Sequence, residues 1–306
     1  MNRSARCIFT RYALVLVLLP LFVLAQEYVE DVAGGGKVDW TQHVIRATGI
    51  GAPNPNLPMA AQRASALRVA KQDALRNVLE TVKGIKLDSR TTVENAMLVS
   101  DRITTRVEGK LRGYKVVDKR YMSSGDVEVD VEVPLTGIVM DALLPKNFGG
   151  GMLMTGGRLL CPVCGQPWPE GKDVPEGVTL IRAGETGDGP SDSQLYSGLI
   201  VDAKGLDIQP AMAPRIVSEE GEEVYGTKYV SRKYAIDIGM AGYGKSINRA
   251  RMNARVSDNP LIVKAVDASG PNQTDLVVSS ADAVRIHNAA SNMDFLKHCK
   301  VLIVLD

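Results

Sequence analysis

Apolar residues between positions 58 and 135 follow first a helical period and then a strand period. A stripe at steps of three or four residues begins after Pro58 and predicts an amphipathic helix that ends near Gly84. The stripe consists of Ala60, Ala64, Leu67, Ala70, Ala74, Val78 and Val82. Because most of these side chains are alanines, the helix backbone can approach a neighbour closely, and we expect it to lie on a sheet.

A second helix and a β-hairpin are predicted after the long helix. Apolar residues four apart favour a helix from Thr92 to Arg106, and residues 114–122 favour a strand that returns through a turn at 123–125. In the returning strand, Val127, Val129, Val131 and Val133 alternate with Asp126, Glu128, Asp130 and Glu132. One face of this strand is therefore expected to be buried and the other solvated, with Lys115, Lys119 and Arg120 balancing the acids.

The residues before the long helix predict one further strand. Trp40 to Ile50 alternates, and Trp40 is expected to fill the core or a sheet edge. Gly34, Gly35 and Gly36 favour a flexible joint inside an N-terminal segment at 26–38. Residues 39–145 are thus predicted to form an α+β module, an antiparallel sheet with the alanine-rich helix and a second helix packed on it.

Three stretches of this module resemble a known family. They are DALRNVLETVKGI (Asp73 to Ile85), VEGKLRGYKVVDKRY (Val107 to Tyr121) and GDVEVDVEVPL (Gly125 to Leu135). Their order and spacing over residues 40–145 are similar to the module shared by the twenty-kilodalton outer-membrane lipoprotein family and the flagellar proteins FlgP and FlgT. The resemblance implies a bacterial envelope protein, and several members build rings or disks around the flagellar motor.

The remainder of the chain divides into a linker and a second unit. Residues 146–193 are rich in glycine and proline and predict a linker or a long irregular insertion. Residues 194–306 predict a small mixed α/β domain. Its expected strands lie at 199–201, 215–217, 222–225, 261–266, 276–278 and 300–305, with a helix at 281–290. The last strand, helix and strand form a plausible βαβ unit, whose two strands would be parallel.

The first 25 residues have the order of an export signal. Three arginines precede an apolar run from Tyr12 to Ala25, which ends in small residues. We expect a cleavable signal peptide, export to the periplasm and a mature chain that starts at Gln26. An uncleaved anchor is the alternative, although the run is shorter than the ~20 residues of a membrane span. No cysteine stands at the cleavage point, so no lipid anchor is evident, and peripheral association with the outer membrane stays open.

The charge of the mature chain excludes one class of partner. The whole chain has 36 basic and 35 acidic residues, and cleavage removes three arginines and no acid, which leaves a net charge of about −2. A nucleic-acid-binding protein needs a strongly basic face, so no nucleic-acid partner is expected.

The linker carries a CxxC motif formed by Cys161 and Cys164. In an oxidising compartment the pair is expected to form a local disulfide. A zinc site is a second interpretation, with Cys299 and a histidine (His43, His287 or His298) completing the ligands. A thiol-redox centre is a third, but the pair lacks the helix N-terminus that usually stabilises a thiolate.

The C-terminal unit contains a match to the phosphate-binding P-loop. Its glycines, lysine and hydroxyl are Gly239, Gly244, Lys245 and Ser246. We interpret this match as coincidental, because residues 231–238 favour a helix where a P-loop needs a strand.

Other catalytic patterns are missing from the sequence. There is no G-x-S-x-G, no H-E-x-x-H and no calcium loop, and the chain has three histidines. We therefore expect a non-enzymatic envelope protein without a cofactor, which acts by self-association or by docking to a ring-shaped neighbour through the strand at 126–133. The alternative is a periplasmic thiol-redox or zinc-dependent protein centred on the CxxC.

Overall fold

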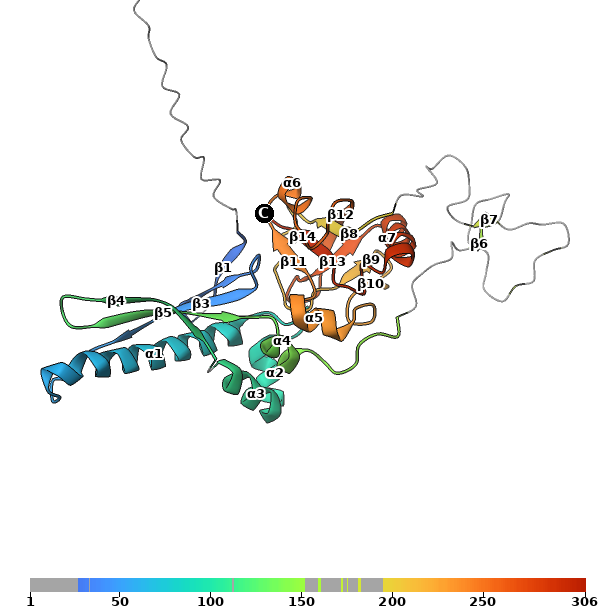
Figure 1. Cartoon of the computed structure of the whole chain (residues 1–306). Coiled ribbons are helices and arrows are strands. Elements are labelled where there is room, and N and C mark those ends of the chain that lie inside the picture. The colour runs from blue at the N-terminus through green and yellow to red at the C-terminus, as the bar shows by residue number, and fades with distance from the viewer. Residues whose placement is uncertain are drawn as a thin grey trace, which may run out of the picture.

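The computed structural model describes residues 27–32, 34–111, 113–151 and 195–306, together with residues 159–160, 172, 175 and 181–182. The chain builds an antiparallel five-stranded sheet in its N-terminal unit and a mixed seven-stranded sheet in its C-terminal unit (Figure 1). This arrangement confirms the predicted α+β class. The leader and the CxxC motif lie outside the described residues.

The N-terminal unit contains five strands and four helices. They are β1 (Val29–Val32), β2 (Gly36–Asp39), β3 (Val44–Gly51), α1 (Met59–Gly84), α2 (Val93–Val99), α3 (Asp101–Leu111), β4 (Lys115–Tyr121), β5 (Val127–Pro134) and α4 (Ile138–Leu143). The strand order in the sheet is β1-β2-β3-β5-β4. Strand β5, through which the sequence analysis expected the chain to associate, is therefore an inner strand, and the edges are β1 and β4.

Helix α1 packs against β3 and β5 along one face of the sheet, and its N-terminal end projects with the β4–β5 hairpin away from the C-terminal unit (Figure 1). Ala66, Ala70 and Ala74 are completely buried, whereas Ala60 and Ala64 of the predicted stripe are exposed. The reason is that β3 ends at Gly51, which meets α1 at Ala66, so the earlier turns of the helix pass beyond the end of the strand.

The alternating hairpin is confirmed. Val127, Val129, Val131 and Val133 are at most 2% exposed, and they face α1. Gly125 takes a left-handed φ of 91° in the turn, a conformation that glycine adopts without the Cβ clash of other residues.

The single helix predicted from Thr92 to Arg106 is wrong, because the chain breaks at Ser100 into α2 and α3. Ser100 is extended, and the Thr104 hydroxyl donates to the Met97 carbonyl at 2.9 Å across the break. The break lets Met97 and Val107 both reach the core, while Val99, one of the apolar residues four apart on which the second helix was predicted, is left 88% exposed.

The prediction of a flexible N-terminal segment is also wrong, because Val29–Val32 and Gly36–Asp39 pair as the antiparallel strands β1 and β2. Gly34 and Gly35 take positive φ values in its turn, and a Cβ on Gly36 would lie 2.1 Å from the Thr81 hydroxyl of α1. The glycines thus allow a tight turn and a close approach to α1. The strand predicted from Trp40 begins at Val44, and residues 40–43 form a turn.

The C-terminal unit contains seven strands and three helices. They are β8 (Gly198–Asp202), β9 (Ile216–Ser218), β10 (Glu223–Tyr225), α5 (Arg232–Ile238), β11 (Gly242–Gly244), α6 (Ile247–Ala250), β12 (Pro260–Ser269), β13 (Asp275–Val278), α7 (Ser280–Met293) and β14 (Val301–Val304). In the part of the sequence that joins the two units, β6 (Leu159–Leu160) pairs antiparallel with β7 (Ile181–Arg182). The strand order of the large sheet is β10-β9-β13-β12-β8-β14-β11.

The predicted parallel βαβ unit at 276–305 is wrong. Strands β12, β8 and β14 are parallel to one another, but β13 pairs antiparallel with β12 and is separated from β14 by two strands. After α7 the chain turns through Asp294, which has a left-handed φ of 49°, and residues 295–299 bring it back so that β14 runs opposite to β13.

Most buried apolar residues of both units belong to one continuous cluster, which runs from Val38 and Trp40 to Ile303 and Leu305. The two sheets therefore share a core at their junction. A smaller second cluster lies in the C-terminal unit and consists of Ile200, Ala250, Val256, Leu302 and Val304. No helix among the described residues is long and apolar enough to cross a lipid bilayer.

Candidate functional site: the sheet edges and the junction

The face of the N-terminal sheet opposite α1 carries paired charges. Arg120 on β4 bonds to Glu128 at 2.8 Å and to Asp130 at 2.6 Å, and it also contacts Asp118. These carboxylates hold the pKa of Arg120 above its usual value, and the bond from Arg120 holds the pKa of Asp130 below its usual value. Glu128 and Asp130 of the acidic row predicted on β5 are thus ion-paired with Arg120 within the unit.

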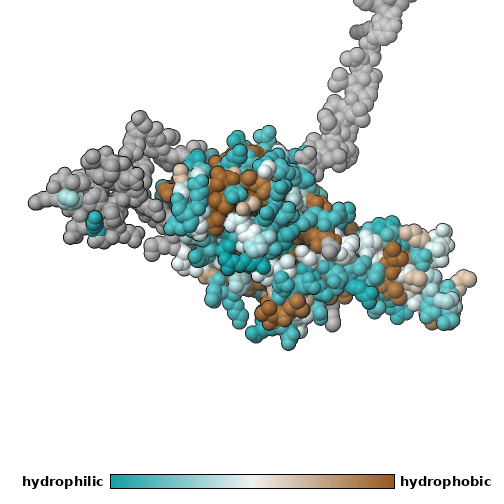
Figure 2. Space-filling model, turned by 180° about the vertical axis from the view of Figure 1, so that it is seen from behind, coloured by the Kyte–Doolittle hydropathy of each residue, from teal (hydrophilic) through white to brown (hydrophobic). Residues whose placement is uncertain are grey.

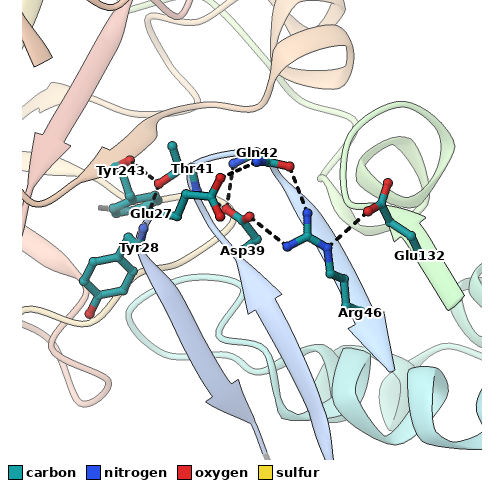
Figure 3. A network of polar contacts seen from close by, with 8 residues as sticks. All are labelled: Glu27, Tyr28, Asp39, Thr41, Gln42, Arg46, Glu132 and Tyr243. Atoms are coloured by element: carbon teal, nitrogen blue, oxygen red, sulfur yellow. Dashed lines mark hydrogen bonds and ion pairs between the residues drawn. The ribbon is translucent and has the colours of Figure 1, made fainter. Parts of the chain in front are cut away.

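A second network ties the start of β3 to the turn at residues 40–43 (Figure 3). Arg46 bonds to Glu132 at 3.2 Å and to Asp39 at 3.4 Å. The Asp39 carboxylate also accepts the backbone amides of Thr41 and Gln42. Burial raises the pKa of Asp39, and the amide bonds and Arg46 oppose that rise. The network fixes the turn that presents residues 40–43 to the C-terminal unit.

Trp40 and Thr41 make the first contacts of this junction. Trp40 is 2% exposed, so it fills the core, as predicted, and its ring lies edge-on to the Tyr243 ring at 5.5 Å. Thr41 donates its hydroxyl to the Tyr243 carbonyl at 3.1 Å (Figure 3). Further along, the amides of Met212 and Ala213 donate to the carbonyls of Lys86 and Leu87, so the junction has backbone as well as side-chain contacts.

Arg255 is the centre of the junction. Its guanidinium donates to the carbonyls of Gly239 at 3.1 Å and Cys299 at 2.9 Å, and also to the Ile238 carbonyl. Its Nη2 lies 3.0 Å from Nε2 of His43 in the N-terminal unit. Because a guanidinium can only donate, Nε2 must be the acceptor, and His43 must be neutral. Burial lowers the pKa of Arg255, and no carboxylate offsets this among its described contacts.

We predict that acid weakens the junction through His43. Burial, and secondly the charge of Arg255, lower the pKa of His43 from 6.5 to about 4. Because the folded pKa lies below the unfolded value, protonation favours unfolding. The contribution of neutral His43 to the free energy of unfolding should be fully present above pH 6.5. The free energy of unfolding should fall by at most about 3 kcal/mol as the pH drops towards 4.

Chemical denaturation at a series of pH values checks this prediction. The His43→Gln variant provides the reference, because it keeps an acceptor beside Arg255 but cannot titrate. The wild type should lose more stability than His43→Gln between pH 6.5 and pH 4. Parallel curves for the two proteins would show that His43 does not carry the effect.

The P-loop-like residues do not form a loop between a strand and a helix. Residues 242–244 are strand β11, which pairs with β14, and α5 precedes them where the sequence favoured a helix. Tyr243 is buried, and the Gly244 carbonyl accepts the Leu305 amide. The ammonium of Lys245 lies 5.4 Å from the centre of the Tyr28 ring. These residues contribute to the sheet and the junction.

The predicted cysteine chemistry is only partly within the described residues. Cys161 and Cys164 lie outside them. Cys299 is completely buried, and burial raises its pKa to about 12, which makes it a poor metal ligand and nucleophile. Among the described residues, no group of three or more His, Cys, Asp or Glu side chains is placed to hold a metal ion. His43 faces Arg255, and His287 lies 2.7 Å from the Val224 carbonyl.

The two edges of the N-terminal sheet are the remaining candidate for function. Strand β4 is exposed along most of its length, with Val117 56% and Tyr121 52% exposed. A bulge between Val116 and Asp118 interrupts its register with β5. At the other edge, β1 exposes 40% of Val29 and 81% of the Asp31 side chain. The sequence did not identify β4 as an edge, because strand order is decided by long-range pairing.

Comparison with known proteins separates the two units. Residues 45–134 match the family model of the LPP20 lipoprotein. The resemblance to the outer-membrane lipoprotein family is thereby confirmed for the N-terminal unit. We call the N-terminal unit the LPP20-like unit. The matched residues run from β3 to the end of β5 and include both α1 and β4. The match names no flagellar protein, so the flagellar part of the resemblance stays a prediction.

Residues 198–306 match a second family model, the second domain of Treponema pallidum Tp0624. This match begins at β8 and contains the whole seven-stranded sheet. No curated protein matches the chain. Neither family model spans half of the chain. Trp40 and His43 precede the first match, whereas their partners Tyr243 and Arg255 in the junction lie inside the second match.

Proposed function

We propose that this protein is a non-enzymatic structural component of the bacterial cell envelope, exported to the periplasm, that takes part in assembling an envelope structure at the outer membrane. The observation that carries the proposal is the match of residues 45–134 to a lipoprotein family, in a unit whose sheet leaves strand β4 unpaired on one side. The flagellar base is the assembly that the resemblance to FlgP and FlgT suggests.

The arrangement of the described residues supports a structural role. On the open sheet face Arg120 is engaged with Glu128 and Asp130, and at the junction Arg255 and His43 hold the two units together. A structural protein that holds its partners in a fixed relative position needs such a rigid connection between its units. In contrast, an exposed edge strand presents backbone donors and acceptors to a further strand.

The proposal is tested on the protein purified from its native host. We expect it in the envelope fraction, with the intact mass of a chain that starts at Gln26. We also expect cross-linking in envelope extracts to capture a high-mass assembly. The variant Val117→Pro should lose that assembly, because proline removes a backbone donor from the β4 edge at its bulge, where the fold tolerates it. The matched control is Val117→Thr, which keeps the donor and the strand preference.

Recovery of the full-length chain from the cytosol would contradict the export part of the proposal. An envelope-located protein whose cross-linked species are unchanged in Val117→Pro would instead contradict the use of β4. A cell that grows and assembles its envelope normally without this chain would remove the assembly role.

A further inference from the structure

We propose that copies of this chain associate head to tail, with strand β4 of one copy pairing along strand β1 of the next. The inference rests on the proposed function and names the partner as a second copy of the same chain. It follows from the two edges of one sheet, which are both free and differ in charge.

Both edges have unused backbone groups. Strand β4 pairs only with β5, and β1 pairs only with β2, in the sheet that the structure describes. Beyond these partners, β1 is held by its Glu30 side chain, which bonds to Lys86 at 3.6 Å and accepts from the Trp40 indole at 2.8 Å. Each edge strand therefore presents a row of unpaired N–H and C=O groups, which is the template for adding a strand from another chain.

The side chains available at the two edges have opposite charge. On β4, Lys115 and Lys119 are exposed and form no ion pair with a described residue, whereas the charge of Arg120 is taken up by the acids beside it. On β1, the Asp31 side chain is 81% exposed and meets one exposed lysine, Lys37, at 3.3 Å. Counted over the strands, β4 carries three basic residues and Asp118, a net charge of +2, whereas β1 carries only Glu30 and Asp31, a net charge of −2.

The registers place the complementary charges on the same side of a joined sheet. Lys115 lies opposite Glu132, and Glu132 lies opposite Arg46 on β3. Asp31 lies opposite Lys37, which in turn lies opposite Arg46. Both Lys115 and Asp31 are thus on the face opposite α1. When β4 and β1 of two copies pair, the lysine and the aspartate can meet across the new boundary.

The charge of Asp118 disfavours pairing of β4 with β4 of a second copy. An antiparallel β4–β4 contact around Asp118 would place like charges together and would leave both β1 edges unused. A contact between different edges repeats from copy to copy, so it produces a closed ring or an open filament. Apolar side chains on the face seen in Figure 2 form separate patches, and no continuous apolar face there offers an obvious alternative for two-fold association.

Single-cysteine cross-linking tests this arrangement in the full mature chain. Cys161 and Cys164 are changed to serine, and the buried Cys299 is retained. Lys115→Cys and Asp31→Cys are then made separately, and Leu98→Cys, which replaces a side chain that is 78% exposed away from both edges, serves as the control. Oxidation of a mixture of the first two variants should give a disulfide dimer between position 115 of one copy and position 31 of the other, because these two positions face each other in the proposed register.

The chain that carries both edge cysteines should give a ladder of higher multimers. In the chain without added cysteines, the charge reversal Lys115→Glu should reduce the multimers that chemical cross-linking captures, and Lys115→Glu combined with Asp31→Lys should restore them. These multimers should also weaken at high salt, because exposed charges are screened. Dimers linked 115 to 115, or mixed dimers no more abundant than those of the Leu98→Cys control, would overturn the inference. If Val117→Pro still loses its envelope partner while no 115–31 link forms, the proposed function stands and the partner is a different protein.

Discussion

Replacing Gly49 by valine should unfold the LPP20-like unit. A Cβ at this position would lie 2.1 Å from the backbone nitrogen of Ala74 and 2.3 Å from the carbonyl oxygen of Ala70. These neighbours are backbone atoms of α1, so no side chain can rotate away, and the whole helix must lift from β3. Overpacking of this kind costs typically about 1–3 kcal/mol, and we expect the upper end of that range or more here.

The effect is measurable by chemical denaturation followed by circular dichroism. Gly109→Ala is the control, because a Cβ there meets nothing within 4 Å and the residue is in helix α3. Alanine at an exposed helical position should raise the free energy of unfolding by about 0.5–1 kcal/mol. If Gly49→Val unfolds at the same denaturant concentration as the wild type, the close contact between α1 and β3 does not exist in solution.

The second large effect is expected at Arg255, whose replacement by methionine should loosen the junction. The change removes the donors to the carbonyls of Ile238, Gly239 and Cys299 and leaves His43 without its partner. A buried acceptor that is left without its hydrogen-bond partner lowers the free energy of unfolding by roughly 1–3 kcal/mol. Because water can replace some of the lost donors, we expect a total loss of about 3 kcal/mol.

Hydrogen exchange locates this loss, and denaturation measures its size. Amides at 40–46 and at 238–244 should exchange faster in Arg255→Met, because these segments meet at the guanidinium. Arg251→Met is the control, since Arg251 is exposed and forms no ion pair or side-chain hydrogen bond with a described residue. Equal exchange and equal stability in the two variants would show that the guanidinium does not hold the units together.

Local pattern was sufficient for most elements. The long helix, the alternating hairpin at 114–133 and the helix at the end of the chain form as predicted, because their periods of 3.6 and 2 residues reflect which side chains face a core. The alanine-rich stripe correctly predicted a helix lying close to a sheet. It did not reveal that Gly49 and Gly51 on β3 are the other half of that contact.

Elements that depend on neighbours were not predictable in the same way. The break at Ser100 arises because Met97 and Val107 must both reach the core, and the hairpin at 29–39 forms because its glycines fit against α1. The antiparallel relation of β13 and β14 depends on which strands enter the sheet between them. None of these conditions is visible within a window of a few residues.

For the candidate site, too, some features follow from residue order and others from the tertiary structure. The sequence by itself determined the envelope family of the N-terminal unit and the alternating valine and acid residues of β5, since both depend on residue order alone. Only the tertiary structure decided that β4 is the edge, that β5 is enclosed, and that Arg255 meets His43 across 212 positions of chain. The physical reason is that strand order and the pairing of distant polar groups are set by the packing of the whole core, which no local period records.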